Sequence, residues 1–284
     1  MKPAPFAYVR AETLDQVFDL LDEYGDDARI LAGGQSLMAT LNMRLSAPEV
    51  LIDINNIPGL SEISSDGETL KIGALARHTQ VLESEDVRKH APLIAKAMPH
   101  VAHQAIRNRG TFGGSVAFAD PAAELPAVVR TLGARLVLQG RNGTRTVAAD
   151  DFFKGLFETD LGESEILIGA EIPAIKDGER TAFMELARRH GDYAIVGIAV
   201  QGKLEGDSFA DMRLGFFGAG DQPILAKSAS AALNGQPNND DTIKKAQDAL
   251  DADLDPMPDL NGPAEMKMHL ARVLTKRALA ELAA

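Results

Sequence analysis

The sequence of 284 residues contains no cysteine and no tryptophan, and positive charge is scarce. Without cysteine the chain cannot form a disulfide framework, a thiolate zinc site or a cysteine-ligated iron–sulfur cluster of its own. Lysine and arginine number 29 against 41 aspartates and glutamates, so the formal net charge is −12. Such an acidic chain has no general attraction for nucleic acid or anionic lipid. We therefore expect neither as a partner.

Long hydrophobic runs are also missing. A run such as AIVGIAV at 194–200 is far shorter than the ~20 apolar residues that span a bilayer. The first ten residues, MKPAPFAYVR, lack the apolar centre of a signal peptide. We therefore expect a cytoplasmic protein with no transmembrane segment. The composition is that of a globular protein with a real core, and the length suggests about two domains.

The first part of the chain alternates between helical and strand patterns. Residues 12–54 predict a helix–strand–turn–helix–strand unit, in which Thr13 and Gln16 have capping-box spacing and Ser36 can cap a short helix. Residues 60–76 predict a hairpin that turns at Asp66-Gly67, and residues 79–98 a helical segment that restarts at Pro92.

The next part predicts a loop at 99–120 and then a helix from Pro121 to about Leu132. Asp120 directly precedes this helix and is a favoured residue type for its N-cap. A hairpin around GRNG at 140–143 and a strand over 165–173 follow.

The pattern shifts near residue 177. Three strands are expected at about 180–188, 194–204 and 209–217, and helices near 226–234, 239–250 and 263–282. Strands followed by helices are typical of an α+β domain. We predict an α+β protein with a domain over 1–177, divided into subdomains at about 1–56 and 57–177, and a smaller domain over 178–284.

Two glycine pairs stand out, in LAGGQSL at 31–37 and in TFGGSVA at 111–117. Glycines in a strand-to-helix turn let backbone N–H groups approach a phosphate, and a nearby serine can add a hydrogen bond. Two such loops can hold one pyrophosphate from both sides. Two unrelated tight turns are the simpler explanation on these residues alone. No stretch fits the P-loop pattern, and GAGDQP at 218–223 departs from the Rossmann pattern.

Other polar residues give weaker signals. His100 and His103 are three residues apart but follow Pro99, so a structural or surface role is favoured over a metal site. Asp120 and Glu124 can share one helix face, which leaves a ligand role for Glu124 open beside the capping role of Asp120. Tyr193 lies in RRHGDYAIV and is equally compatible with a half-buried core position and with a ligand contact.

Taken together, LAGGQSL, IRNRGTFGGSVAFADPAAELP, EILIGAEIP and the RR-x-x-D-Y-A segment resemble the FAD-binding medium subunit of molybdenum hydroxylases. The resemblance is to the carbon monoxide dehydrogenase medium-chain type, related to the flavin domain of xanthine dehydrogenase, and it covers essentially the whole chain. It implies a two-subdomain, PCMH-type FAD-binding domain followed by a smaller α+β domain with a three-stranded antiparallel sheet and helices.

The same resemblance implies which residues contact non-covalent FAD. The first loop supplies Ala32, Gly33, Gly34, Gln35, Ser36 and Leu37, and the second supplies Thr111, Gly113, Gly114 and Ser115. Asp120 and Glu124 are acidic contacts, Val101 and Leu167 are apolar contacts, and Tyr193 lies beside the isoalloxazine ring. No catalytic side chain and no metal ligand are implied in this chain.

Four positions depart from the family pattern. Gln35 stands where histidine is frequent, Phe112 where isoleucine or leucine is usual, and Ser115 where asparagine is usual. Serine can still donate and accept hydrogen bonds. Met184 occupies a position where related flavin domains can carry lysine, which argues against lysine-dependent tuning of the flavin.

The function that the resemblance implies is electron transfer within a complex of three chain types. The substrate cannot be named from this chain, because the molybdenum pocket lies in another chain. A large subunit holds the molybdenum cofactor and a small subunit holds two [2Fe–2S] clusters; FAD in this chain passes electrons to an external acceptor. A dimer of such heterotrimers is expected from the family. The alternatives are a self-contained PCMH-type flavin oxidase and a degenerate scaffold subunit without FAD. Carbon monoxide, an aldehyde, a purine or another N-heterocycle all remain possible substrates.

Overall fold

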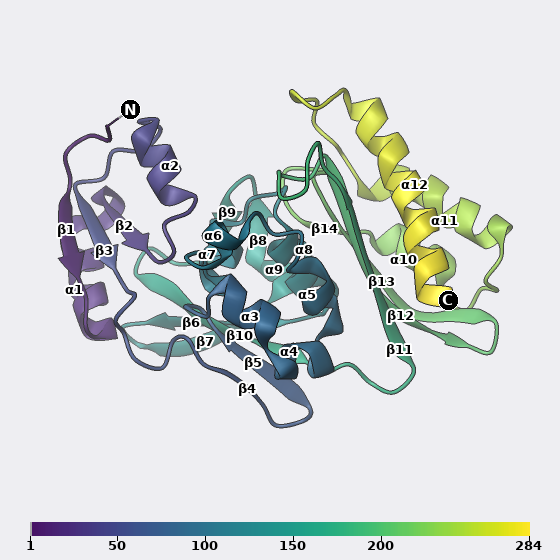
Figure 1. Cartoon of the computed structure of the whole chain (residues 1–284), viewed down its shortest axis with the longest axis horizontal. Coiled ribbons are helices and arrows are strands. Elements are labelled where there is room, and N and C mark those ends of the chain that lie inside the picture. The colour runs from purple at the N-terminus through teal and green to yellow at the C-terminus, as the bar shows by residue number, and fades with distance from the viewer. Residues whose placement is uncertain (1) are drawn as a thin grey trace.

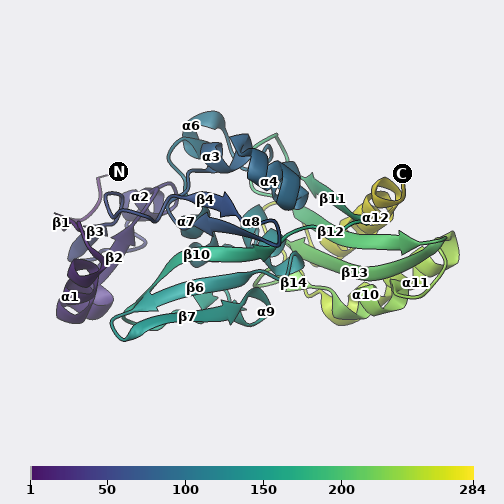
Figure 2. The same ribbon diagram turned by 90° about the horizontal axis from the view of Figure 1, so that it is seen from below.

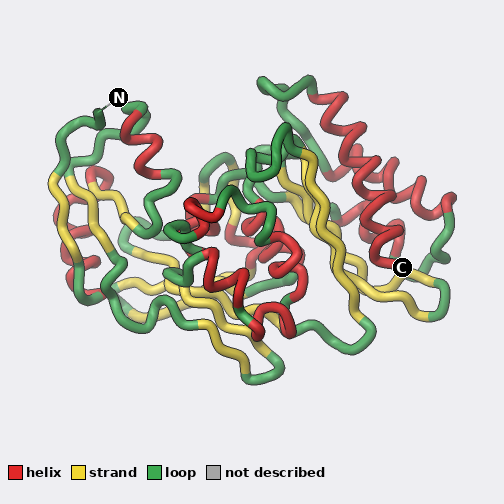
Figure 3. Tube along the Cα trace, viewed as in Figure 1, coloured by secondary structure: helices red, strands yellow, loops and turns green. Residues whose placement is uncertain are grey.

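The computed structural model describes residues 2–284 and consists of three larger β-sheets arranged in a row with helices packed between and around them (Figures 1 and 3). From the N-terminus to the C-terminus these are a parallel sheet of three strands, an antiparallel sheet of five and an antiparallel sheet of four. Across residues 2–284, none of the helices combines the length and apolar character needed to span a bilayer.

The first sheet has the strand order β1-β3-β2, with α1 packed against β2 and β3. Its elements are β1 (Ala7–Arg10), α1 (Leu14–Tyr24), the 3-10 turn η1 (Gly25–Asp27), β2 (Ala28–Leu31), α2 (Leu37–Asn42) and β3 (Val50–Asp53). The predicted cap of α1 is confirmed, because the Thr13 side chain accepts from the Gln16 N–H. Strand β1 was not predicted. Ser36 precedes α2, but its side chain makes no capping bond, so that prediction was wrong.

The second sheet has the order β4-β5-β10-β6-β7 and is built from the two predicted hairpins with β10 inserted between them (Figure 2). Its strands are β4 (Ile63–Ser65), β5 (Thr69–Gly73), β6 (Arg135–Gly140), β7 (Gly143–Ala148) and β10 (Glu165–Pro173). Helices α4 (Glu85–His90) and α7 (Phe112–Phe118) pack against its strands. A separate small hairpin, β8 (Phe153–Gly155) and β9 (Glu158–Thr159), lies nearby.

Short helices join the strands of this middle region. They are α3 (His78–Glu83), α4 (Glu85–His90), α5 (Pro92–Ala97), α6 (Gln104–Arg107), α7 (Phe112–Phe118), α8 (Glu124–Thr131) and α9 (Ala149–Phe152). The predicted restart at Pro92 is confirmed. The prediction of a continuous loop over 99–120 was wrong, because α6 and α7 lie within it. Helix α8 begins at Glu124, three residues after Pro121, with Ala123 at its N-cap position.

Asp120 therefore does not cap α8. Its Oδ1 accepts from the Ala122 N–H at 2.9 Å, and its own carbonyl accepts from the Ala123 N–H at 3.0 Å. These bonds close a turn of the Asx kind before the helix, in which the side chain mimics a backbone acceptor. The preference of aspartate for such turns competes with its preference for N-caps, and here the turn forms.

The third sheet has the order β11-β12-β13-β14. Its strands are β11 (Glu179–Leu186), β12 (Val196–Glu205), β13 (Ser208–Phe217) and β14 (Ile224–Leu225), followed by α10 (Lys227–Leu233), α11 (Asp240–Asp253) and α12 (Ala264–Ala283). The three predicted strands and three predicted helices are confirmed. The prediction that the sheet has only three strands was wrong, because a fourth strand, the two-residue β14, pairs with β13.

This third sheet is covered on both faces. Helices α10 and α12 pack on one face, whereas α5 and α8 from the middle region pack on the other. Phe183 and Phe217 stack with ring centroids 5.6 Å apart and belong to the same buried core as Leu93 and Val128. The seam between the middle and C-terminal regions is therefore an apolar core.

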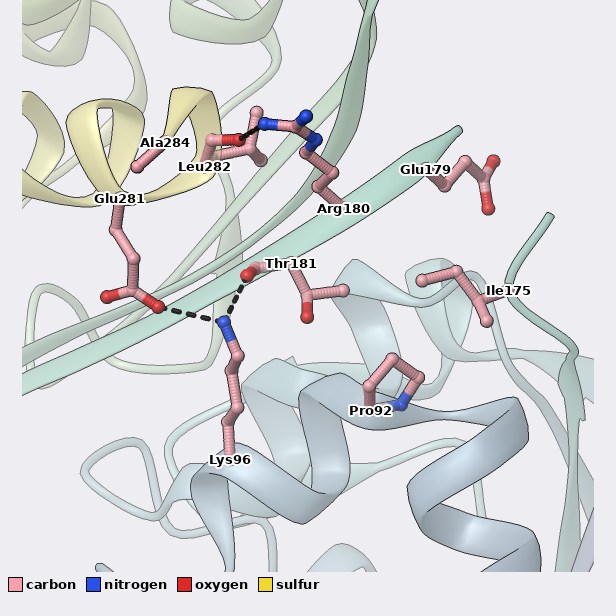
Figure 4. A pocket seen from close by; sticks show the side chains of 9 residues that line it. All are labelled: Pro92, Lys96, Ile175, Glu179, Arg180, Thr181, Glu281, Leu282 and Ala284. Atoms are coloured by element: carbon pink, nitrogen blue, oxygen red, sulfur yellow. Dashed lines mark hydrogen bonds and ion pairs between the residues drawn. The ribbon is translucent and has the colours of Figure 1, made fainter. Parts of the chain in front are cut away.

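One end of this seam is polar and open. Lys96 on α5 reaches across to the Glu281 Oε1 of α12 at 2.8 Å and to the Thr181 carbonyl of β11 (Figure 4). These residues line a cavity of about 310 Å³. Its other lining residues lie on α5, on β11 and just before it, and at the end of the chain, and no residue of either glycine loop contributes.

A candidate flavin site where the two glycine loops meet

The first glycine loop runs from the end of β2 to the start of α2. Gly34 has a φ of +71°, a conformation that favours glycine over residues with a side chain. Within residues 2–284, the backbone N–H groups of residues 33–37 donate to no protein acceptor. Unpaired and partly accessible N–H groups that follow one another in a turn are typical of an anion-binding loop.

The two glycine loops lie against each other. A Cβ atom on Gly33 would be 2.7 Å from the Gly110 Cα and closer still to the Arg109 carbonyl oxygen, so only glycine fits there. A Cβ on Gly114 would be 3.8 Å from the Ala32 Cβ. The hypothesis of two unrelated turns is therefore wrong: the two pairs form parts of one surface.

The second loop contributes in a different way from the first. The Gly113 N–H donates to the Ala74 carbonyl at 2.8 Å, and the Gly114 N–H donates to Thr111 Oγ1 at 3.1 Å. The Phe112 and Ser115 N–H groups are bonded to backbone carbonyls as well. The expectation that both loops present free backbone N–H groups is wrong for the second. Gly113 is there for packing, since its Cβ would lie 2.6 Å from the Ala74 Cα.

The buried side chain of His78 is hydrogen-bonded to the start of the second loop. Its Nε2 lies 2.9 Å from the Thr111 carbonyl oxygen, so this nitrogen carries the proton and donates. Burial lowers the pKa of His78 to about 4, which keeps the ring neutral at physiological pH. His78 was not predicted from the sequence, because a lone histidine at a helix start carries no distinguishing pattern.

The loop that carries Tyr193 packs against the segment that carries Val101. A Cβ on Gly191 would be 2.8 Å from the Ala102 carbonyl oxygen, and Arg107 Nη1 donates to the Val101 and Ala102 carbonyls at 2.9 Å each. Val101 is buried, as predicted for an apolar contact. The two segments thus approach each other although 92 positions separate Val101 from Tyr193 in the sequence.

Tyr193 links the first glycine loop to the acidic residues. Burial raises the pKa of its hydroxyl, the carboxyl groups of Asp120 and Glu124 raise it further, and a hydrogen bond with Ser36 opposes them. The side chain is nevertheless 63% exposed, so water screens much of this effect. A large aromatic side chain exposed to this extent beside the loops is available to stack on a ligand ring.

Glu124 lies at the start of α8 and is buried, with 8% of its surface exposed. Burial raises the pKa of Glu124 to about 7; its own backbone N–H and His100 oppose the increase, while Glu185 and Asp120 add to it. Burial likewise raises the pKa of Asp120. At neutral pH Glu124 is therefore only partly ionised, which reduces its repulsion of an adjacent anionic ligand.

His100 contacts the acidic cluster from the other side. Its Nδ1 lies 3.3 Å from Glu185 Oε1, and this partner raises the pKa of His100 above its ordinary value despite burial. The favoured structural role of His100 is thus an ion pair across the seam between α5 and β11. Among the described residues no group of three or more acidic or histidine side chains is arranged to hold a metal ion.

Leu167, a predicted FAD contact, and Met184, where related flavin domains can carry lysine, lie in different cores. Leu167 is buried on β10, next to Ile168, whose carbonyl accepts from the Ala74 N–H that supports the second loop. Met184 lies on β11 and packs against the C-terminal core with α10–α12. Met184 therefore contributes an apolar contact to this core and no positive charge.

The arrangement offers hydrogen-bond donors for an anion at one end and an aromatic side chain with buried acids at the other. Residues 4–175 match the family model "FAD binding domain in molybdopterin dehydrogenase", and residues 181–282 match "CO dehydrogenase flavoprotein C-terminal domain". The chain belongs to the FAD-binding medium subunits of the molybdenum hydroxylases. It is therefore a component of an oxidoreductase.

Relatives of this medium subunit match it along its full length. The carbon monoxide dehydrogenase medium chain of Hydrogenophaga pseudoflava is 36% identical over 279 residues, which cover 98% of this chain and 97% of the relative. The glyceraldehyde dehydrogenase medium chain of Sulfolobus acidocaldarius is 35% identical over 283 residues, covering 100% of both.

Solved structures show the same fold. Carbon monoxide dehydrogenase from Hydrogenophaga pseudoflava superimposes with a TM-score of 0.97 at 37% identity, covering 99% of this medium subunit and 98% of that chain. Quinoline 2-oxidoreductase from Pseudomonas putida 86 gives a TM-score of 0.94 at 37% identity, with coverage of 100% and 98%. The predicted fold class is confirmed.

The residues of this medium subunit fit FAD. The free N–H groups of residues 33–37 suit the pyrophosphate, and the close approach at Gly33 keeps side chains out of its way. Neither the cavity at Lys96 nor a second one of about 350 Å³ beside Arg130 and Asp255 includes a residue of this surface. The candidate flavin site is formed by the two glycine loops and the segments beside them.

Proposed function

We propose that this chain is the FAD-carrying subunit of a heterotrimeric molybdenum hydroxylase, which takes electrons from [2Fe–2S] clusters in a small partner and passes them through FAD to an external acceptor. The observation that carries the proposal is the meeting of the two glycine loops, with the N–H groups of residues 33–37 unpaired. The absence of cysteine supports the division of cofactors between chains, because this chain has no thiolate for a cluster.

The chain's residues bind and orient FAD, which supplies the redox chemistry when bound. In the proposal the backbone of residues 32–37 donates to the pyrophosphate, and the second loop, Thr111 to Ser115, shapes the opposite wall. Val101, Leu167 and Tyr193 pack against the cofactor, while Asp120 and Glu124 contact it through carboxyl groups whose pKa values burial raises. No side chain of this chain acts as a general base.

The proposal includes partners and organisation. A large subunit with the molybdenum cofactor and a small [2Fe–2S] subunit complete the complex, as a dimer of heterotrimers in the cytoplasm. The domain division at residue 177 is part of the proposal and is supported by the segment between β10 and β11, where the two family models also part. The substrate is determined by the large subunit.

We expect the purified chain to carry one FAD, all of which acid denaturation followed by filtration releases. The chain has no cysteine for a covalent link, and no histidine lies within either glycine loop. Absorbance spectra of the protein and of the filtrate measure both quantities. Flavin that stays on the polypeptide would indicate the self-contained oxidase type, and a colourless protein that binds no added FAD would indicate a scaffold subunit. Oxidation of an organic substrate by the lone chain would contradict the electron-transfer role.

Replacement of Tyr193 by alanine is expected to leave FAD bound but to change the reoxidation rate of the reduced flavin. The ring lies beside Ser36 and the acidic pair and is largely exposed, so its loss alters the surroundings of the flavin ring more than the pyrophosphate contacts. Stopped-flow reoxidation with an artificial acceptor measures the rate. Tyr24→Phe is the control, because Tyr24 ends α1 and belongs to neither glycine loop. Equal rates and equal flavin content in Tyr193→Ala and wild type would remove Tyr193 from the site.

A further inference from the structure

Two side chains outside both glycine loops connect the loops to each other. Asn55, which follows β3, donates through Nδ2 to the Ala32 carbonyl at 2.8 Å, and its Oδ1 accepts from Arg77 Nη2 at 2.7 Å. The other terminal nitrogen of Arg77 donates to the Arg109 carbonyl. This is the carbonyl that faces Gly33. The backbone of the first loop is thus joined to that of the second through Asn55 and Arg77.

The connection is anchored at both ends. Asp53 Oδ1 accepts from the Asn55 backbone N–H at 2.8 Å and from Asn55 Nδ2 at 2.6 Å, and Asp53 Oδ2 accepts from the Tyr8 hydroxyl. Burial alone would raise the pKa of Asp53, but the hydrogen bonds from Tyr8 and Asn55 bring it below its ordinary value, so it stays ionised. At the other end Arg77 is fixed as the N-cap of α3, where its N–H donates to Gln80 Oε1 at 2.8 Å.

We propose that Asn55 and Arg77 are positioning residues that hold the first glycine loop against the second before FAD binds, so that the N–H groups of residues 33–37 already face the pyrophosphate. The proposal rests on the proposed function. Unpaired N–H donors in a loop give the highest affinity when the loop is ordered in advance, because the ligand then does not have to order it. Neither side chain needs to contact the cofactor for this role.

Asn55 must be an amide for this arrangement. Its Nδ2 gives both protons to acceptors, and its Oδ1 receives one, so each group is used in a fixed orientation. Aspartate has the same shape but no donor, and would set a second carboxylate against Asp53 and the Ala32 carbonyl. Lysine in place of Arg77 keeps the charge but cannot donate from two separate nitrogens to Asn55 and Arg109 at once.

The test measures the dissociation constants of FAD and ADP for the full chain freed of flavin, by calorimetry. We expect Asn55→Asp and Arg77→Lys each to weaken FAD roughly 10- to 100-fold, and to weaken ADP by the same factor, since the two ligands share the pyrophosphate. Asn142→Asp, in the exposed β6–β7 turn, is the matched control and should leave both constants unchanged. The double variant should lose little more than the worse single variant, because both act in one chain of bonds.

Hydrogen exchange separates positioning from general destabilisation. In the flavin-free chain the amides of Met38 and Thr40, which donate to the Gly34 and Ser36 carbonyls of the first loop, should exchange faster in both variants, while those of the buried strand β12 stay unchanged. If Asn55→Asp does not fold, Arg77→Lys carries the test. Wild-type affinity for FAD and ADP in both variants, or additive losses in the double variant, would overturn the positioning role alone. A wild-type chain that does not bind FAD would overturn the proposed function and this proposal with it.

Discussion

Replacing Gly33 by alanine is expected to weaken FAD binding by roughly 5- to 150-fold. The added Cβ would lie 2.7 Å from the Gly110 Cα and closer to the Arg109 carbonyl oxygen, and neither backbone atom belongs to a flexible side chain that can move aside. Overpacking of this kind costs about 1–3 kcal/mol, which gives the stated range in the dissociation constant. The dissociation constant is measured by titrating the flavin-free chain with FAD and monitoring the quenching of flavin fluorescence.

The neighbouring substitution Gln35→Ala is the control. Gln35 is exposed, and its Nε2 donates to the Gly33 carbonyl at 2.9 Å, an interaction that water can replace. We expect a loss of about threefold or less, corresponding to the lower range for a single hydrogen bond. Similar losses in Gly33→Ala and Gln35→Ala would mean that the close contact between the loops is not what maintains the site.

The features that could be predicted from the sequence are those with local signals. Thr13 and Gln16 mark the start of α1, Asp66-Gly67 marks a hairpin, and the third sheet follows from three runs of strand-forming residues. The glycine pairs were found for the same reason, since a left-handed φ at Gly34 and a close approach at Gly33 both exclude other residues. Their assignment to one surface came from the resemblance to a family.

The features that could not be predicted depend on tertiary contacts. Helix α7 contains two glycines, which lower helix propensity, yet it forms because Thr111 caps it and Gly113 packs against Ala74. Asp120 was assigned to a cap because propensity ranks that role highly, whereas the bond to the Ala122 N–H forms a turn. Asn55 and Arg77 carry no motif at all. Their role follows only from carbonyl groups that lie far from them in the sequence.

The free energy of unfolding should depend on the ionisation of Glu124. Its pKa is about 7 in the folded chain, because it is buried, against an ordinary value of 4.5. Between these values the folded state binds the proton more tightly than the unfolded state, so stability falls as the pH rises from about 4.5 and the loss is complete above about pH 7. The difference between the two values corresponds to about 3 kcal/mol.

Two histidines also titrate in this range, with opposite signs. The pKa of His78 is lowered to about 4, so the unfolded state binds more protons and stability rises with pH up to about 6.5. The pKa of His100 is raised, chiefly by its hydrogen bond with Glu185, so its contribution is present below about pH 6.5 and is lost at higher pH. The wild-type curve alone therefore cannot isolate Glu124 below pH 6.5, and a difference between variants is needed.

Glu124→Gln supplies that difference, because it keeps the size of the side chain and removes its ionisation. Relative to wild type, the variant should gain about 2.5 kcal/mol of stability between pH 5 and pH 8, because part of the full difference is already lost at pH 5; urea unfolding of the flavin-free chain measures the gain. The contributions of His78 and His100 are common to both proteins and largely cancel. Glu163→Gln, in an exposed loop, is the matched control and should follow wild type at every pH. A difference between Glu124→Gln and wild type that is the same at pH 5 and pH 8 would show that Glu124 is already ionised in the folded chain at pH 5, and that burial beside Asp120 and Glu185 does not keep it neutral.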